Sequence, residues 1–139
     1  MRIILKILIA LLLFALAAAI VAVMLLRFRG SSAVQNGYAR ITQEEAARVM
    51  AEETGWLLLD VRRADEFAEG HIPGAMNLPN ERIGAAEIAE LPDKGQTLLV
   101  YCRSGSRSKD AAAKLAALGY RDVREFGGII DWTGEIVTD

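Results

Sequence analysis

The sequence predicts an α/β domain with a mostly parallel central sheet and helices on both faces, preceded by one transmembrane helix. Three observations support this prediction. The runs 56–60 and 97–101 are continuously apolar, as strands are when both faces of a parallel sheet are covered. Segments with helical periodicity alternate with these runs. A stretch without charged residues, 7–26, lies near the amino terminus.

The charges of the 139 residues are unevenly distributed. Arg2, Lys6, Arg27 and Arg29 are the only charged residues among the first 29, and all 18 acidic residues lie at or after Glu44. The remainder is therefore acidic, which excludes a basic nucleic-acid-binding protein. One cysteine cannot form an internal disulfide, and with a single histidine it cannot provide a Cys/His zinc site.

Residues 7–26 have the length needed to cross the hydrocarbon core of a membrane, about 30 Å. A buried core helix would show a polar face, and this segment has none. A cleaved signal peptide would end near a small-residue site such as Ala17–Ala19, but the apolar run continues past it. We therefore expect an uncleaved single-pass anchor. The flanking positive charges are nearly balanced, and the short basic head favours a domain outside the cytoplasm.

The domain organisation follows from these segments. We expect a basic tail over 1–6, the anchor over 7–26, a flexible linker over 27–37 and a folded domain over 38–139. Thr42 and Glu45 form a capping box that begins the first helix of the domain. Helices are predicted up to 53 and over 64–69, 85–90 and 108–118, with strands over 56–60, 75–78, 97–101 and 122–126. A short helical segment is predicted to end near Trp132.

The loop after the second buried strand is the candidate site, because ligands of open α/β sheets bind at the carboxyl ends of strands. It contains Cys102, Arg103, Ser104, Gly105, Ser106, Arg107 and Ser108. Backbone amides of such a loop and the helix that follows stabilise an anion, here a thiolate or persulfide. Arg103, Arg107 and Lys109 are expected to lower the pKa of Cys102. A lone cysteine is often only a small buried residue, but the polar, cationic residues after it favour a nucleophile.

Three segments of the chain resemble the rhodanese, or sulfurtransferase, superfamily. The first comprises Leu59–Arg62, Glu66–Phe67, Gly70–Ala75 and Asn77–Pro79. The second is Val100–Ser108, and the third comprises Gly119–Tyr120, Gly127–Ile129 and Trp132. The resemblance covers about 41–132 and implies the three-layer rhodanese-like fold.

The resemblance also implies a rhodanese-type sulfurtransferase without cofactor or metal. Cys102 would take a sulfane sulfur from a donor such as thiosulfate, rest as a persulfide, and pass the sulfur to a thiol or to cyanide. Arg103 to Ser108 would bind the substrate. His71, in a Gly-His-Ile-Pro-Gly turn, is expected to be a supporting residue, as is Asp60. Arg62 is either a second supporting residue or a solvated strand end.

Two other chemistries and one non-catalytic role compete with sulfur transfer. Cysteine phosphatases place Arg six positions after the cysteine, where this chain has Ser108, so phosphatase activity is not expected. Arsenate reduction remains an alternative because some single-domain relatives carry it out. The remaining alternative is a non-catalytic rhodanese-like module that binds a partner at the membrane.

Overall fold

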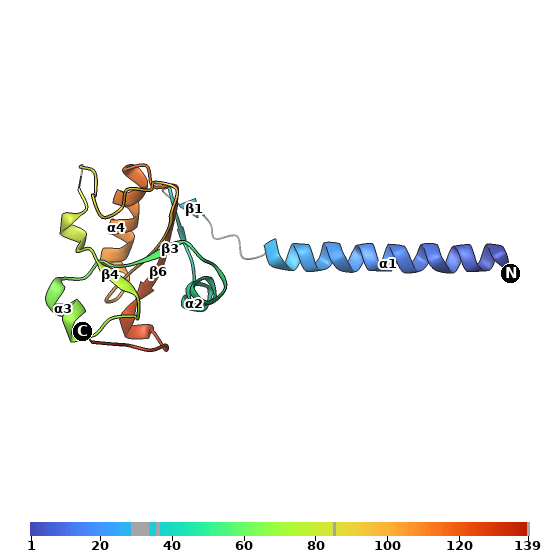
Figure 1. Ribbon diagram of the computed structural model, residues 1–139, viewed down its shortest axis with the longest axis horizontal. Helices are drawn as coiled ribbons and strands as arrows, with labels where there is room; N and C mark the ends of the chain where they lie inside the picture. Colours follow the sequence, from blue (N-terminus) through green and yellow to red (C-terminus); the bar gives the residue numbers. More distant parts are fainter. Residues whose placement is uncertain (29–33, 36, 85, 139) are drawn as a thin grey trace. The chain divides into compact units, whose positions relative to one another are not determined.

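The computed structural model describes residues 1–28, 34–35, 37–84 and 86–138 (Figure 1). An amino-terminal helix and a folded unit are distinct parts of the chain and are described in turn.

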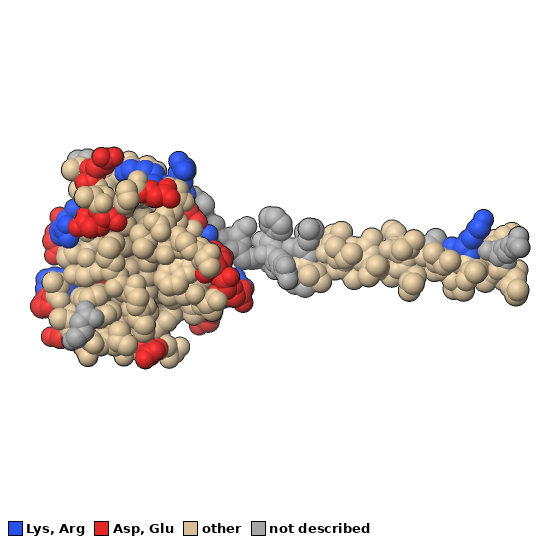
Figure 2. Space-filling view, viewed as in Figure 1, with Lys and Arg blue, Asp and Glu red and all other residues tan. Residues whose placement is uncertain are grey.

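The amino-terminal helix, α1, extends over Arg2–Phe28 and is longer than the predicted anchor. Its segment Ile3–Val23 has the length and apolar composition of a membrane span, properties that a signal sequence shares. The described side chains of this segment are exposed and apolar except for Lys6. Along the part of α1 that is described, Figure 2 shows basic atoms near the amino-terminal end and uncharged residues elsewhere.

The folded unit contains a six-stranded sheet in the order β1-β2-β6-β5-β3-β4. The strands are β1 (Val34–Gln35), β2 (Tyr38–Arg40), β3 (Trp56–Asp60), β4 (Ala75–Asn77), β5 (Thr97–Cys102) and β6 (Asp122–Gly128). Among the strands of this sheet that the structure describes, β1 and β2 pair antiparallel, and the other neighbours are parallel. The predicted parallel sheet is therefore confirmed. Strand β1 lies in the segment predicted as a linker, while 29–33 and 36 lie outside the described residues.

Helices cover both faces of this sheet (Figure 1). They are α2 (Gln43–Glu52), α3 (Ala64–Glu69) and α4 (Ser106–Ala117), with 3-10 turns η1 (Asn80–Arg82) and η2 (Ile129–Asp131). Helix α4 packs Ala111, Ala112 and Leu115 on one face, against Leu98 and Val100 of β5. Helix α2 packs Ala46 and Val49 on the other face, against Leu99 of β5. Strand β5 is therefore buried on both sides, as its continuous apolar sequence predicts.

Thr42 caps α2 as predicted, because its hydroxyl oxygen accepts a hydrogen bond from the amide of Glu45 at 3.1 Å. The predicted helix over 85–90 is wrong: residues 86–90 are turn and irregular backbone, and Ala85 lies outside the described residues. The segment instead inserts Ile88 and Leu91 into the core. A six-residue helix is marginal by itself, and these two buried contacts fix the chain without one.

Candidate active site

Cys102 is the last residue of β5, at the carboxyl edge of the sheet. From β5 the chain continues to its neighbour β6, whereas from β3 it continues to β4 on the opposite side. This reversal of strand order is where open α/β sheets bind their ligands. Residues 102–108, here called the Cys102 loop, therefore occupy the edge that the sequence predicts for the site.

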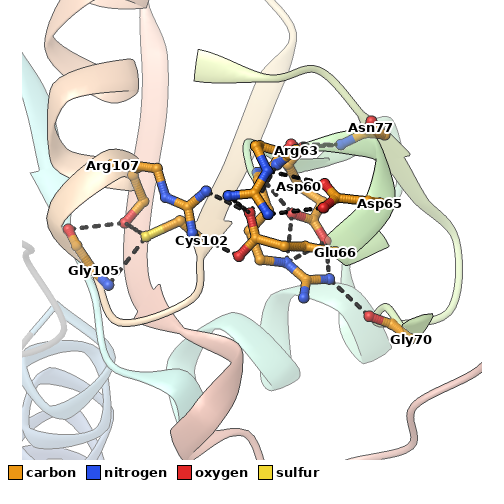
Figure 3. Close-up of polar contacts among 11 residues, drawn as sticks. Asp60, Arg63, Asp65, Glu66, Gly70, Asn77, Cys102, Gly105 and Arg107 are labelled. Atoms are coloured by element: carbon orange, nitrogen blue, oxygen red, sulfur yellow. Dashed lines mark hydrogen bonds and ion pairs between the residues drawn. The ribbon is translucent and has the colours of Figure 1, made fainter. Parts of the chain in front are cut away.

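The Cys102 sulfur is buried, with the residue 1% exposed, yet it has polar contacts. The amide of Gly105 donates a hydrogen bond to Sγ at 3.1 Å, and Sγ lies 3.5 Å from the Ser108 hydroxyl (Figure 3). Burial raises the pKa of the thiol, but hydrogen bonding with the Ser108 hydroxyl and with backbone amides of the loop outweighs burial and lowers the pKa below its ordinary value. The loop thus favours the thiolate mainly through hydrogen bonds and less through arginine charges.

Two glycines allow the loop to take this shape. Gly105 has a φ of 100°, a left-handed conformation that aims its amide at the sulfur and begins α4. Gly128, on the neighbouring strand, lies directly against the backbone of Arg103, and a Cβ at this position would be 2.1 Å from the Arg103 carbonyl oxygen. Strand β6 therefore packs directly against the backbone of the loop. Any side chain at position 128 would overlap the Arg103 carbonyl group.

The two arginines of the loop have different environments. Arg103 is exposed, and among the described residues its side chain forms no hydrogen bond or ion pair. Arg107 instead points to α3, where its guanidinium donates to both carboxylate oxygens of Glu66 at 2.6 and 2.9 Å (Figure 3). The hydrogen bond from Arg107 is the main reason that the pKa of Glu66 falls to about 2. Arg103 is therefore the more available cation for an anionic substrate.

Asp60 and Arg62 form a buried pair after β3 rather than a solvated strand end. The Arg62 guanidinium donates to Asp60 at 2.6 Å and to the Gly70 carbonyl at 2.7 Å. The Asn77 side chain donates to the backbone carbonyls of both Asp60 and Arg62. These bonds join the ends of β3 and β4 to the segment at Gly70, so the solvated interpretation of Arg62 is wrong.

His71 is buried at 4% exposure and belongs to the same framework. Its ring stacks on Phe67 with centroids 3.8 Å apart, and its backbone pairs with Val137 in both directions at 2.9 Å. Its Nδ1 lies 3.0 Å from the Phe67 carbonyl oxygen. These contacts connect α3 to Val137 near the carboxyl terminus, and the supporting role of His71 at the site stays a prediction.

The remaining loop residues face different surroundings. Ser106 is exposed at the first turn of α4, and Ser108 is buried. Ser104 is exposed and borders a hollow of about 380 Å³ that is also lined by Gln43, Gly127 and Asp131. Among the residues that the structure describes, no group of three or more His, Cys, Asp or Glu side chains is placed to hold a metal.

Sequence reasoning missed three residues of the site: Glu66, Glu125 and the close contact of Gly128. Glu66 is 41 positions from Arg107, and nothing in the sequence pairs them. A signal for Glu125 existed, because alternation along β6 places it on the same face as the buried Val123. The Gly127-Gly128 pair was also a signal, because glycine in a strand often marks a close approach of another backbone segment.

The fold and the loop define a class: an α/β protein with a single cysteine in an amide-lined loop at the carboxyl edge of a parallel sheet. Comparison with known proteins agrees with this class. The rhodanese-like domain family matches residues 42–135, and the chain therefore belongs to the rhodanese family.

Individual relatives carry the same family name or activity. A sulfurtransferase of Allochromatium vinosum is 40% identical over 93 residues, which cover 66% of this chain and 85% of the relative. The thiosulfate sulfurtransferase PspE of Escherichia coli is 34% identical over 73 residues, covering 52% and 70%. A solved structure of a rhodanese with anions from E. coli has a TM-score of 0.55 and 31% identity, covering 60% of this chain and 99% of that one.

Proposed function

We propose that this protein is a sulfurtransferase that moves a sulfane sulfur from a donor such as thiosulfate to a thiol acceptor through a persulfide on Cys102. The observation that carries the proposal is the Gly105 amide, 3.1 Å from the Cys102 sulfur, in a loop that lowers the pKa of the thiol. A thiolate is the nucleophile that this chemistry needs. The thiosulfate sulfurtransferases among the relatives support the choice of donor.

The reaction takes place in two steps at one sulfur atom. The Cys102 thiolate attacks the outer sulfur of thiosulfate, the S–S bond of the donor breaks, and sulfite leaves with the electron pair. The persulfide that remains has an anionic terminal sulfur, which amides of the Cys102 loop stabilise. An acceptor thiolate then attacks that terminal sulfur and regenerates the Cys102 thiolate. No second cysteine is needed, in keeping with the single cysteine of the chain.

The two arginines have separate tasks in this proposal. Arg103 is exposed and attracts the anionic donor to the loop. Arg107, held by Glu66, ties the first turn of α4 to α3 and keeps the loop in place. The donor is therefore oriented mainly by Arg103 and by loop amides, with Arg107 contributing a charge that Glu66 partly neutralises.

Mass spectrometry of the purified full chain in detergent, after incubation with thiosulfate, tests the proposal. We expect a gain of one sulfur, about 32 Da, that cyanide removes. The Cys102→Ser variant, treated in the same way, acquires no adduct. If the wild-type chain gains no sulfur from thiosulfate or other sulfane donors, the sulfurtransferase proposal is wrong and the non-catalytic binding module is favoured.

We also propose that 7–26 anchors the protein in a membrane as a single-pass helix. The apolar segment Ile3–Val23 supports this proposal, because 21 helical residues span about 30 Å. The extracytoplasmic orientation of the domain remains a prediction from the basic head. Reporter fusions placed after Leu26 test it, and a cytoplasmic signal would reverse the assignment.

A further inference from the structure

Glu125 is a buried carboxylate on β6 to which neither the sheet nor the proposed sulfur transfer assigns a role. The residue is 0% exposed and lies beside the Cys102 loop. Its Oε1 accepts hydrogen bonds from the Ser108 hydroxyl and from the Gly127 amide, each at 2.8 Å. Its Oε2 is buried without a hydrogen-bond partner among the described residues. A buried charge that is only half satisfied is costly, so a functional reason for its presence is expected.

Ser108 connects this carboxylate to the nucleophile. The Ser108 hydroxyl lies 2.8 Å from Glu125 Oε1 and 3.5 Å from Cys102 Sγ. Its other neighbours, the carbonyl oxygens of Gly105 and Gly127, are at 3.1 and 3.2 Å. A hydroxyl has one proton to donate, and the carboxylate is its nearest and only charged acceptor. The Ser108 oxygen is then free to accept a hydrogen bond from the Cys102 thiol.

We propose that Glu125, acting through Ser108, is the internal proton acceptor for the Cys102 thiol. Glu125 does not contact the sulfur, so it is a positioning residue that acts through the serine. The proposal deepens the function given above and rests on it for the sulfur chemistry that follows thiolate formation.

The proton transfer balances without any external group. The S–H bond of Cys102 breaks as its proton passes to Ser108 Oγ, and the original hydroxyl proton of Ser108 passes to Glu125 Oε1. The products are a thiolate and a neutral carboxylic acid, so the net charge of the buried site is unchanged. Ser108 keeps one proton, which now points to the thiolate and stabilises it. No electrons are gained or lost.

Groups on three neighbouring elements face Glu125 or the serine that it contacts. From β2, Arg40 places its Nε 3.7 Å from Oε2, and its side chain is 63% exposed. From α4 the facing group is Ser108, and from β5 the facing titratable group is Cys102. Arg40 is the one ion-pair partner of Glu125 among the described residues, and water screens it. Hydrogen bonds from the loop amides favour the thiolate form of Cys102.

The pH dependence of Cys102 alkylation tests the proposal on the full chain in detergent. Iodoacetamide is neutral and small, and the chain has no other cysteine to react. With an internal acceptor, the thiolate fraction is constant between the two apparent pKa values of the Cys102–Glu125 pair. We therefore expect the wild-type rate to level off on the acid side and to fall again only when the Cys102–Glu125 pair binds a second proton.

Two variants make the prediction specific. Glu125→Gln keeps the shape of the side chain and removes the acceptor, so its rate should fall by about tenfold per pH unit without levelling off. Arg40→Gln removes the facing positive charge, which strengthens Glu125 as an acceptor. Its plateau should therefore be higher and should end at a higher pH. A purely structural effect would scale the rate equally at all pH values.

The outcomes separate this inference from the proposed function. A wild-type profile without a plateau, or a plateau that persists in Glu125→Gln, would overturn the role of Glu125. If Glu125→Gln does not fold, the plateau of the wild type and its displacement in Arg40→Gln decide the question. Failure of thiosulfate to add sulfur would overturn the proposed function alone, because alkylation requires no sulfur donor.

Discussion

At the scale of single residues, the ion pair between Arg107 and Glu66 distinguishes two arginines that look alike in the sequence. Both flank the loop glycine, but only Arg107 reaches α3. The Arg107 side chain is 31% exposed and that of Glu66 is 16% exposed, so the pair is largely shielded from water. Such a pair contributes more than one on the open surface. We infer that it stabilises the fold next to the loop as well as the loop itself.

Glu66→Gln should therefore destabilise the folded unit at neutral pH. A pKa lowered from 4.5 to about 2 corresponds to at most about 3 kcal/mol, and exposure of Arg107 reduces our expectation to about 1–2 kcal/mol. Because the folded pKa lies below the unfolded value, the contribution is complete above about pH 4.5 and disappears as pH falls towards 2. The difference in melting temperature from wild type should shrink over that range.

Tryptophan fluorescence measures this difference on the full chain, since both tryptophans, Trp56 and Trp132, belong to the folded unit. Glu69→Gln is the matched control, because Glu69 is exposed on the same helix. It should melt like the wild type at every pH. A Glu66→Gln deficit that stayed constant down to pH 2 would contradict the assignment of the ion pair.

At the scale of elements, the position of the loop depends on how closely β6 approaches β5. Cys102 and Gly128 are partners in register, after a shift that follows Val100. The amide of Ile130 in η2 donates to the Arg103 carbonyl at 3.2 Å, and the Gln43 side chain of α2 donates to the Gly128 carbonyl at 2.7 Å. Two neighbouring elements thus hold the start of the loop.

Gly128→Ala should displace the loop, because its Cβ would lie 2.1 Å from the Arg103 carbonyl oxygen. A shift of about 1 Å in reacting groups can cost about 100-fold in rate, so we expect a loss of this order in the rate of sulfur loading. The measurement is the time course of adduct formation by mass spectrometry. Gly84→Ala is the control, since no atom lies within 4 Å of its Cβ position, and its rate should equal that of the wild type.

The sequence predicts features of these elements where the signal lies in one continuous segment, and it misses features that depend on contacts between distant segments. The run 97–101 and the polar loop after it correctly indicated a buried strand with Cys102 at its carboxyl end. The helix predicted over 85–90 is wrong although the composition of the segment is helical. Burial of Ile88 and Leu91 in the core determines the backbone there, and only the tertiary structure shows this burial. The link between Glu125 and Cys102 likewise depends on packing between β6 and α4, which no local pattern shows.

At the scale of the whole molecule, the apolar and charged residues are divided between two parts of the chain. The overall hydrophobic content of 53% reflects in part a long apolar helix. The acidic residues all belong to the folded unit. Such a helix is either a signal sequence, which is cleaved from the mature protein, or an anchor, which stays part of it.

If α1 is an anchor, the full chain expressed in a bacterial host should remain in the membrane fraction after a high-salt or alkaline wash. The intact mass of the isolated protein should include residues 1–26. Leu12→Arg combined with Leu13→Arg should release it, because each arginine at the centre of a span costs about 2.5–3.5 kcal/mol and both positions lie within Ile3–Val23. Leu12→Ile combined with Leu13→Ile keeps the apolar character and should stay membrane-bound. A soluble wild-type protein whose mass begins after Ala19 would instead identify the segment as a cleaved signal.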